Sequence, residues 1–238
     1  MSSLDALTTN TTGAQNTAVG TFASNTNTTG ADNTVVGYAA MFLNTTGGQN
    51  VAVGRNALNN NTVSNNTAVG YYALNANTTG ANNVAVGDRC LDSNTTGENN
   101  TAVGQHALGA VTTGNFNTAM GQGALFRNTA DDNTAFGNHC LLNNTSGTAN
   151  TAVGENALND NTTASNNTAI GKSALELNTT GHSNVAVGTF ALDANTTGVG
   201  NNAIGYGALG ANTTASDNTA IGHVSLTLNT TGTQNLSL

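Results

Sequence analysis

The side chains that could do chemistry are few and scattered. Among 238 residues the chain has two cysteines, four histidines, twelve acidic residues and only four Lys or Arg residues. No spacing among them matches a metal-ligand motif, and the one acidic pair, Asp131-Asp132, does not belong to a repeated Asp-rich loop. The many Ser and Thr hydroxyls have no base beside them at a recurring spacing. We therefore expect neither an enzyme nor a bound cofactor or metal.

One group of side chains recurs at a spacing that could serve binding. A 17-residue repeat, described below, places aromatic and basic residues at its sixth and seventh positions in consecutive copies. Stacked about 4.8 Å apart, they would form an aromatic and basic strip on a mostly neutral surface. Aromatic faces and arginine donors suit carbohydrate binding. The alternative is ordinary variation at an exposed corner. We call this candidate site the Tyr-Arg strip, and it consists of Tyr38, Arg55, Tyr71, Tyr72, Arg89 and His106.

The elements that would position the strip come from an internal repeat. The glycine of Asn-x-Ala-Val-Gly occurs at thirteen places, 16 or 17 residues apart. The repeat reads N-T-A-V-G-x-x-A-L-x-x-N-T-T-G-x-x, and we number its slots 1 to 17 from the first Asn. Slot 1 is Asn and slot 13 is Thr in every copy, whereas slots 6, 7, 10, 11, 16 and 17 vary. Partial copies extend to both ends, so we expect residues 1–238 to form a single repeat array.

The length of the repeat predicts its fold. Seventeen residues are too few for a helix-pair repeat, and Gly, Asn and Thr are weak helix formers. We predict an all-β fold, a parallel β-solenoid of about 13 coils with 17 residues per coil. Strands are expected on Thr-Ala-Val, on Ala-Leu and on Thr-Thr, with corners at Gly and the variable pairs. The two 16-residue copies lack one residue between slots 14 and 17, where a loop tolerates a deletion.

Stacking of identical slots would hold such a solenoid together. Slots 4 and 9, mostly Val and Leu, would form apolar columns, and the Ala of slot 8 suits a tight interior. The Asn and Thr ladders of slots 1 and 13 would add hydrogen bonds. The pattern leaves open whether Ala with Gly and Asn, or Thr with Val, faces inward on the strand. Because each coil buries only about two large apolar side chains, we expect an oligomer whose chains share a core.

The two cysteines both replace the Ala of slot 8. Cys90 and Cys140 lie three repeats apart, about 14 Å in a stack, which is too far for an intrachain disulfide. We expect small buried hydrophobic side chains, with an interchain pair near an oligomer axis as the alternative. The histidines are expected to decorate the surface, in slot 7 (His106 and His139), slot 16 (His182) and slot 6 (His223).

Composition and charge exclude several classes of partner. The formal net charge is −8, which argues against nucleic acid. No run of 18 apolar residues exists, so we expect no membrane insertion. The first residues, Met-Ser-Ser-Leu-Asp, do not resemble a signal peptide, so export would use another route or follow cell lysis.

The block Asn-Thr-Ala-Val-Gly, followed by Ala-Leu and Asn-Thr-Thr-Gly, resembles the repeats of phage tail fibres and related trimeric fibre adhesins. Its Ala-Val-Gly and Ala-Ile-Gly parts are similar to the head repeats of trimeric autotransporter adhesins, which are left-handed parallel β-rolls of three chains with shorter coils. The resemblance covers nearly the whole chain. It implies an intertwined or side-by-side homotrimer that forms a shaft or head on a virion tail or at a cell surface. The sequence departs from the family pattern in that we recognise no coiled-coil stalk, membrane anchor or self-cleaving chaperone domain in it, which some such fibres carry, so we expect a shaft or head only.

Three functions compete on this basis. The first is a structural fibre or adhesin segment that displays, or contributes to, attachment to a host-surface glycan or receptor. The second is ice binding by Thr ladders, although slots 13 and 14 are adjacent and would face opposite sides of a strand; a thermal-hysteresis assay separates it from the first. The third is a self-assembling extracellular filament, which electron microscopy would reveal. A solution mass of three times 23.7 kDa would favour the trimeric fibre.

Overall fold

The computed structural model describes residues 5–238, and the only regular secondary structure in that range is β-strand. Fourteen short strands follow one another along the chain. The chain divides into two compact units, Met1–Asn117 and Thr118–Leu238. Each unit is a parallel β-solenoid built from the 17-residue repeat, which confirms the predicted fold class. The single array over residues 1–238 and the homotrimer stay predictions.

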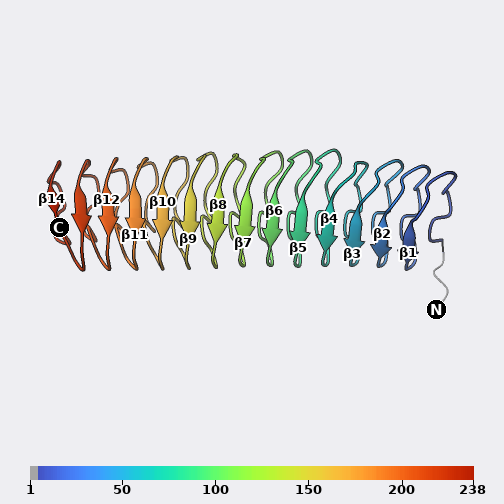
Figure 1. Ribbon diagram of the computed structural model, residues 1–238, viewed down its shortest axis with the longest axis horizontal. Coiled ribbons are helices and arrows are strands. Elements are labelled where there is room, and N and C mark those ends of the chain that lie inside the picture. The colour runs from blue at the N-terminus through green and yellow to red at the C-terminus, as the bar shows by residue number, and fades with distance from the viewer. Residues whose placement is uncertain (1–4) are drawn as a thin grey trace. The chain divides into compact units, whose positions relative to one another are not determined.

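In the first unit, six strands pair in chain order, each parallel to the next (Figure 1). The register joins identical slots, so Thr17 is opposite Thr34 and Ala18 is opposite Val35. The strands are β1 (Thr17–Val19), β2 (Thr34–Val36), β3 (Val51–Val53), β4 (Thr67–Val69), β5 (Val84–Val86) and β6 (Thr101–Val103).

The second unit repeats this arrangement with eight strands in chain order. Its register also joins identical slots, for example Ala169 with Ala186. The strands are β7 (Thr118–Met120), β8 (Thr134–Phe136), β9 (Thr151–Val153), β10 (Thr168–Ile170), β11 (Val185–Val187), β12 (Asn202–Ile204), β13 (Thr219–Ile221) and β14 (Leu236–Ser237).

The two shortened copies leave the register intact. The missing residues fall at Val63-Ser64-Asn65 and Ala130-Asp131-Asp132, where the chain bends between strands. Strand pairing continues across both, with Val51 opposite Thr67 and Thr118 opposite Thr134. The prediction that the deletions lie in loops is therefore confirmed.

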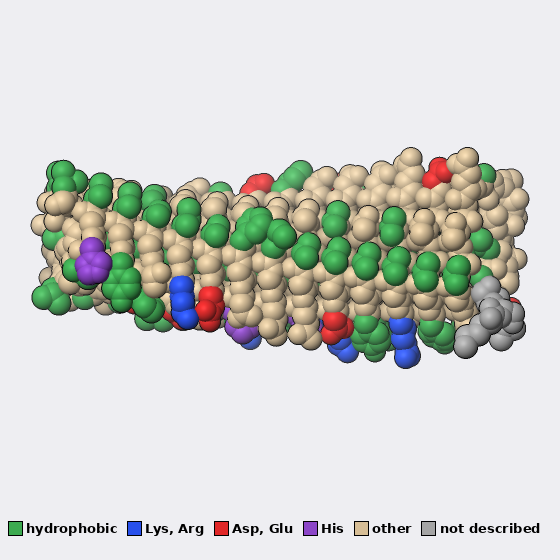
Figure 2. All heavy atoms as spheres, turned by 60° about the horizontal axis from the view of Figure 1, so that its bottom comes forward, with side chains coloured by type: hydrophobic (Ala, Val, Ile, Leu, Met, Phe, Trp, Pro, Cys, Tyr) green, Lys and Arg blue, Asp and Glu red, His purple; other side chains and the backbone are tan. Residues whose placement is uncertain are grey.

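The exposure of the strands shows which of their faces lies inward. The middle residue, the Ala of slot 3, is fully buried in almost every coil, whereas slots 2 and 4 are half-buried or exposed. Of the two orientations that the sequence left open, the strand therefore adopts the one with Ala, and not Thr and Val, facing the core. The Leu column of slot 9 is buried as predicted. Slot 4 also stacks as an apolar column, as predicted, but on the outer face of the strands, where its side chains are half-buried or exposed and add to the hydrophobic rows of each unit's surface (Figure 2). The expectation that a second large apolar side chain of each coil is buried is therefore wrong.

The predictions of strands on Ala-Leu and on Thr-Thr are wrong. Within residues 5–238 these segments form turns and bends, and only the Thr-Ala-Val prediction is confirmed. The Leu of slot 9 has a left-handed backbone, for example φ 53° at Leu158. Adjacent residues of a strand point to opposite faces. The left-handed turn instead lets Ala157 and Leu158 both point into the core, where each has 0% exposure.

Two columns of buried asparagines connect successive coils. In slot 12, Asn178 Nδ2 donates to Asn161 Oδ1 at 2.9 Å and to the carbonyl oxygen of Gly181 at 2.8 Å. In slot 1, the backbone N–H of Asn184 donates to Asn167 Oδ1 at 2.9 Å, so the predicted ladder is confirmed with the backbone as donor. Buried amides of this kind cost little when every polar atom has a partner, and they then specify one register.

The threonines of slot 13 form a ladder of a different kind. Their hydroxyls donate to the backbone carbonyl oxygen of the same slot in the next coil, as Thr179 Oγ1 does to Thr196 at 3.0 Å. The hydroxyl proton is thus used within the solenoid. Slot 13 is therefore always Thr for a structural reason, since its hydroxyl joins each coil to the next by a hydrogen bond.

The slot 12 ladder has one natural break. Slot 12 is Asn in every coil except the one that carries Val111. In the preceding coil, Asn94 Oδ1 is buried and has no hydrogen-bond partner. An unpaired buried acceptor costs about 1–3 kcal/mol.

We therefore expect Val111→Asn to raise the free energy of unfolding by about 1 kcal/mol, because it adds the missing donor. Urea denaturation measures this difference. Val111→Ala is the control, since it removes volume without adding a donor and should lower stability. An unchanged or lower stability of Val111→Asn would contradict the ladder argument.

Candidate functional site

The Tyr-Arg strip lies on one edge of the first unit, directly after the strands. The Gly of slot 5 turns the chain there, with φ between 129° and 145°. Slot 7 of each coil is then tied to slot 6 of the coil before it. The backbone N–H of Tyr72 donates to the Arg55 carbonyl oxygen at 3.0 Å, and that of Arg89 donates to Tyr71 at 2.8 Å. The strip side chains are thus carried on hydrogen-bonded backbone.

The structure brings five of the six predicted strip residues into two clusters. The guanidinium carbon of Arg55 lies 5.4 Å from the centre of the Tyr38 ring. That of Arg89 lies 6.0 Å from Tyr71 and 5.9 Å from Tyr72. The rings of Tyr71 and Tyr72 are 4.5 Å apart and tilted by 59°. These distances are those of cation–π pairs, so each guanidinium is held against an aromatic face.

The sixth predicted residue, His106, acts electrostatically on Asp92. Asp92 lies in slot 10 beside the strip and is half-buried. Burial raises the pKa of this carboxyl above its ordinary value, while His106 and Arg89 act in the opposite direction and Asp88 raises it slightly. The strip thus combines aromatic rings, two arginines and a carboxylate at the same edge.

Two aromatic residues at the N-terminal end of the strip were missed in the sequence. Phe22 meets Tyr38 edge-to-face at 6.0 Å and Phe42 at 6.2 Å. Together with Ala39 they line a shallow pocket of about 250 Å³. The sequence contained the signal, because Phe22 occupies slot 7 of one copy of the repeat and Phe42 occupies slot 10 of the next copy.

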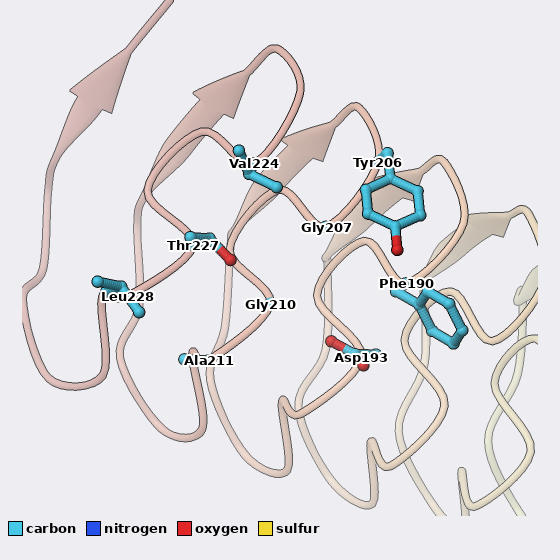
Figure 3. Close-up of a pocket in the computed structure, with 9 residues that line it drawn as sticks. All are labelled: Phe190, Asp193, Tyr206, Gly207, Gly210, Ala211, Val224, Thr227 and Leu228. Carbon is cyan, nitrogen blue, oxygen red and sulfur yellow. The ribbon is translucent and has the colours of Figure 1, made fainter.

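A second aromatic cluster, also missed, lies at the same slots of the second unit. Phe190 and Tyr206 meet edge-to-face at 6.0 Å, and His223 stacks on Tyr206 at 5.3 Å with a 13° tilt. A pocket of about 360 Å³ opens beside them (Figure 3). The rings of this cluster could have been predicted from the sequence, because they occupy slots 6 and 7 of the second unit. The pocket itself depends on which neighbouring slots hold glycine.

The edge of the second unit also carries an ion pair. Lys172 Nζ lies 3.0 Å from Glu155 Oε2, and both belong to slot 6 of consecutive coils. Both side chains are more than half exposed, so the pair contributes little to stability. It shows that neighbouring coils place variable side chains within contact distance of one another.

The two cysteines belong to the core. Cys90 and Cys140 are free and fully buried, and Cys90 Sγ donates to the Ala102 carbonyl oxygen at 3.1 Å. Burial raises the pKa of each thiol to about 12, so both are protonated at neutral pH. The interpretation as small buried hydrophobic side chains is confirmed.

Within residues 5–238 no cluster of three or more His, Cys, Asp or Glu side chains is arranged to hold a metal ion, and the Asp131-Asp132 corner is no exception. The same range contains no helix long and apolar enough to span a membrane.

Repeat, register and core together define this chain as a parallel β-solenoid repeat protein. No protein-family model matches it, and no match is found among curated proteins. Its function therefore has to be argued from its own surface.

Proposed function

We propose that this chain is a structural segment of an attachment fibre or adhesin, on a virion tail or a cell surface, that contacts a surface glycan or receptor and catalyses no reaction. The observation that carries the proposal is the Tyr-Arg strip, in which Arg55 and Arg89 each lie over a tyrosine ring of the coil before their own. Pairing with the rings limits the conformational freedom of each guanidinium before a ligand arrives, which lowers the entropic cost of binding.

Carbohydrate is the ligand class that this surface suits best. Tyr38 and Tyr71 are each more than 40% exposed, so they offer apolar ring surface with a hydroxyl at the edge. The arginine donors beside them can bind sugar hydroxyls or the carboxylates of acidic sugars. The remaining surface of the repeat is mostly Asn, Thr and Gly, which explains why a charged macromolecular partner such as nucleic acid is a poorer fit.

The outward row of slot 4 supports self-association. Its side chains are apolar in every coil, and the most exposed are 37–56% accessible in the single chain. A long exposed apolar row is typical of an interaction surface. We propose that it packs against copies of the same chain in a homo-oligomer, with the trimer favoured. The slot 4 side chains with more than one-third of their surface exposed are Val19, Val36, Met120, Phe136, Val153, Ile170, Ile204 and Ile221.

The test of the proposal is binding of the labelled chain to a glycan array and to whole bacterial cells, with the solution mass measured on the same sample. The double variant Tyr71→Thr with Arg89→Asn is expected to lose at least about tenfold in binding, because hot-spot contacts are concentrated in aromatic and Arg side chains. Both new residues already stand at these slots elsewhere, as Thr21 and Asn56, so the variant should fold.

Phe116→Asn is the matched control. Phe116 is 60% exposed but lies in slot 17, on a different part of the coil, and Asn occupies that slot with the same backbone at Asn99. We expect this variant to bind as the unaltered chain does. Equal loss in both variants, or no loss in the strip variant, would refute the strip as the contact site.

Ice binding is the second candidate, and one observation favours it. The Thr of slot 2 lies on the outer face of the strands, on the same side as the apolar slot 4, an orientation that the sequence left open. Nine of the thirteen copies carry Thr there, and Val51, Val84, Val185 and Asn202 interrupt the row. The slot 13 ladder is a poorer ice surface, since its hydroxyls donate to backbone carbonyls. Thermal hysteresis at micromolar protein would favour this candidate over the fibre segment.

A further inference from the structure

The pocket of about 360 Å³ in the second unit has the size of a small-molecule site. It lies on the surface of three consecutive coils, at slots 6, 7, 10 and 11 (Figure 3). Aromatic and aliphatic side chains form most of its wall, and Asp193 supplies its one charged group.

The pocket exists because one coil carries two glycines where its neighbours carry side chains. Gly207 and Gly210 occupy slots 7 and 10, while the preceding coil has Phe190 and Asp193 there. Figure 3 shows both glycines on the coil that lies between the one carrying Phe190 and Asp193 and the one carrying Val224. A Cβ atom at Gly207 would meet only a methyl group of Val224, at 3.4 Å. A Cβ atom at Gly210 would lie 3.2 Å from the Gly207 carbonyl oxygen and 3.4 Å from Thr227 Oγ1, so the open space comes mainly from the missing side chain at Gly207.

The carboxylate at this pocket lacks a cation. Asp193 is half-buried, and no Lys, Arg or His within residues 5–238 forms an ion pair with it. Burial raises the pKa of its carboxyl, backbone N–H groups of Asp193 and Ala194 lower it, and the nearby Glu176 carboxylate raises it again. Two carboxylates in slot 10 of consecutive coils therefore create a negative potential beside the aromatic rings.

The first unit shows what the same slots hold when the cation is supplied by the chain. Asp92 occupies slot 10 there, with Arg89 in slot 7 of its own coil and His106 in slot 7 of the next. Both side chains lower the pKa of the Asp92 carboxyl, and Arg89 also lies over tyrosine rings. Around Asp193 the corresponding slots hold Phe190 and Gly207. Phe190 thus replaces Arg89, and Gly207 leaves the space of the His106 side chain open, so neither slot supplies a positive group to Asp193.

We propose that this pocket binds a small organic ammonium group, of the kind found in choline or in a primary alkylamine. The cation would lie above Gly207 and Gly210, with its charge toward Asp193 and its methyl or methylene groups against Phe190, Tyr206 and Val224. A cation beside aromatic rings and a partly desolvated carboxylate gains from both. The site goes beyond the proposed function, since it uses none of the residues of the Tyr-Arg strip.

The test is a titration of the full chain with choline chloride and, separately, with butylammonium chloride. Binding is monitored by calorimetry and by ligand-observed NMR. Sodium chloride at matched ionic strength is the reference. We expect saturable binding in the millimolar range for at least one salt, and the preferred salt distinguishes a quaternary from a primary ammonium. Asp193→Asn is expected to weaken binding at least about tenfold, because it removes the charge and keeps the shape.

A second variant tests the cavity without touching the charge. Gly207→Asn fills the floor of the pocket and should abolish binding. It should fold, because Asn56 and Asn156 occupy the same slot at φ 56° and 58°. Asp92→Asn in the first unit is the matched control and should leave ammonium binding unchanged. Absence of saturable binding for both salts, or an equal effect of Asp92→Asn and Asp193→Asn, would overturn the proposal.

Discussion

Replacing Gly205 with Ala is expected to cause a large loss of stability, although it adds only one methyl group. Gly205 has φ 132°, in a region that side-chain-bearing residues rarely adopt. Its added Cβ would lie 2.6 Å from the carbonyl carbon of Gly222 in the next coil and 3.2 Å from the His223 amide nitrogen. These atoms belong to backbone that is itself held in the coil-to-coil ladder, so neither can move without breaking hydrogen bonds.

We expect Gly205→Ala to lower the free energy of unfolding by at least about 3 kcal/mol, measured by urea denaturation of the full chain. Gly207→Ala, two residues away, is the matched control. Gly207 has φ 60°, and Ala39 holds the same slot at φ 51° without glycine. A change of less than about 1 kcal/mol is expected there. Similar losses in both variants would show that the close approach of the slot 5 glycines does not govern stability.

The second large effect is expected from Asn161→Ala, which interrupts the slot 12 ladder in the middle of the second unit. Asn161 is fully buried. Its Nδ2 donates to Asn144 Oδ1 at 2.8 Å and to the Ala164 carbonyl oxygen at 3.0 Å, while its Oδ1 accepts from Asn178 at 2.9 Å. The substitution leaves buried donors and acceptors on both neighbouring coils without partners, which costs more than the hydrogen bonds themselves contributed.

We expect Asn161→Ala to destabilise the chain by about 3 kcal/mol, again by urea denaturation. Asn202→Ala provides the control, since Asn202 is exposed in slot 2, where other coils carry Thr or Val. Its effect should stay within about 0.5 kcal/mol. If Asn161→Ala were as mild as Asn202→Ala, the buried amides would be dispensable and apolar burial alone would hold the coils together. The natural break at Val111 shows that one interruption is compatible with folding, so a measurable native state is expected.

Both predictions concern contacts between identical slots, and these were the part of the structure that the sequence determined most directly. A strict period of 16 or 17 residues, with Asn, Thr and Gly recurring in register, predicts parallel stacking of like on like. That inference needed no knowledge of the path of a coil. It also placed the deletions in loops, the cysteines in the core and the Tyr-Arg strip along one edge.

Within one coil, residue type alone determined much less. Thr, Val and Leu in short runs predicted three strands, but only the Thr-Ala-Val segment is one. At slot 9 the backbone of Leu158 is left-handed, because only that conformation lets Ala157 and Leu158 point into the same narrow interior. The gain from burying both side chains outweighs the local cost of the conformation, and that balance depends on the neighbouring coils.

The repeat therefore determined the fold class, the register and the candidate binding edge, since each follows from the spacing of identical residues. The tertiary structure decided which strand face is buried, which side chains at the edge touch, and where the surface is hollow. Exposure of Val153 and burial of Ala152 depend on how the coil closes, and the pocket at Gly207 depends on the side chains of the coils on either side. Such properties are set by contacts between residues about 17 positions apart, and a single repeat does not contain them.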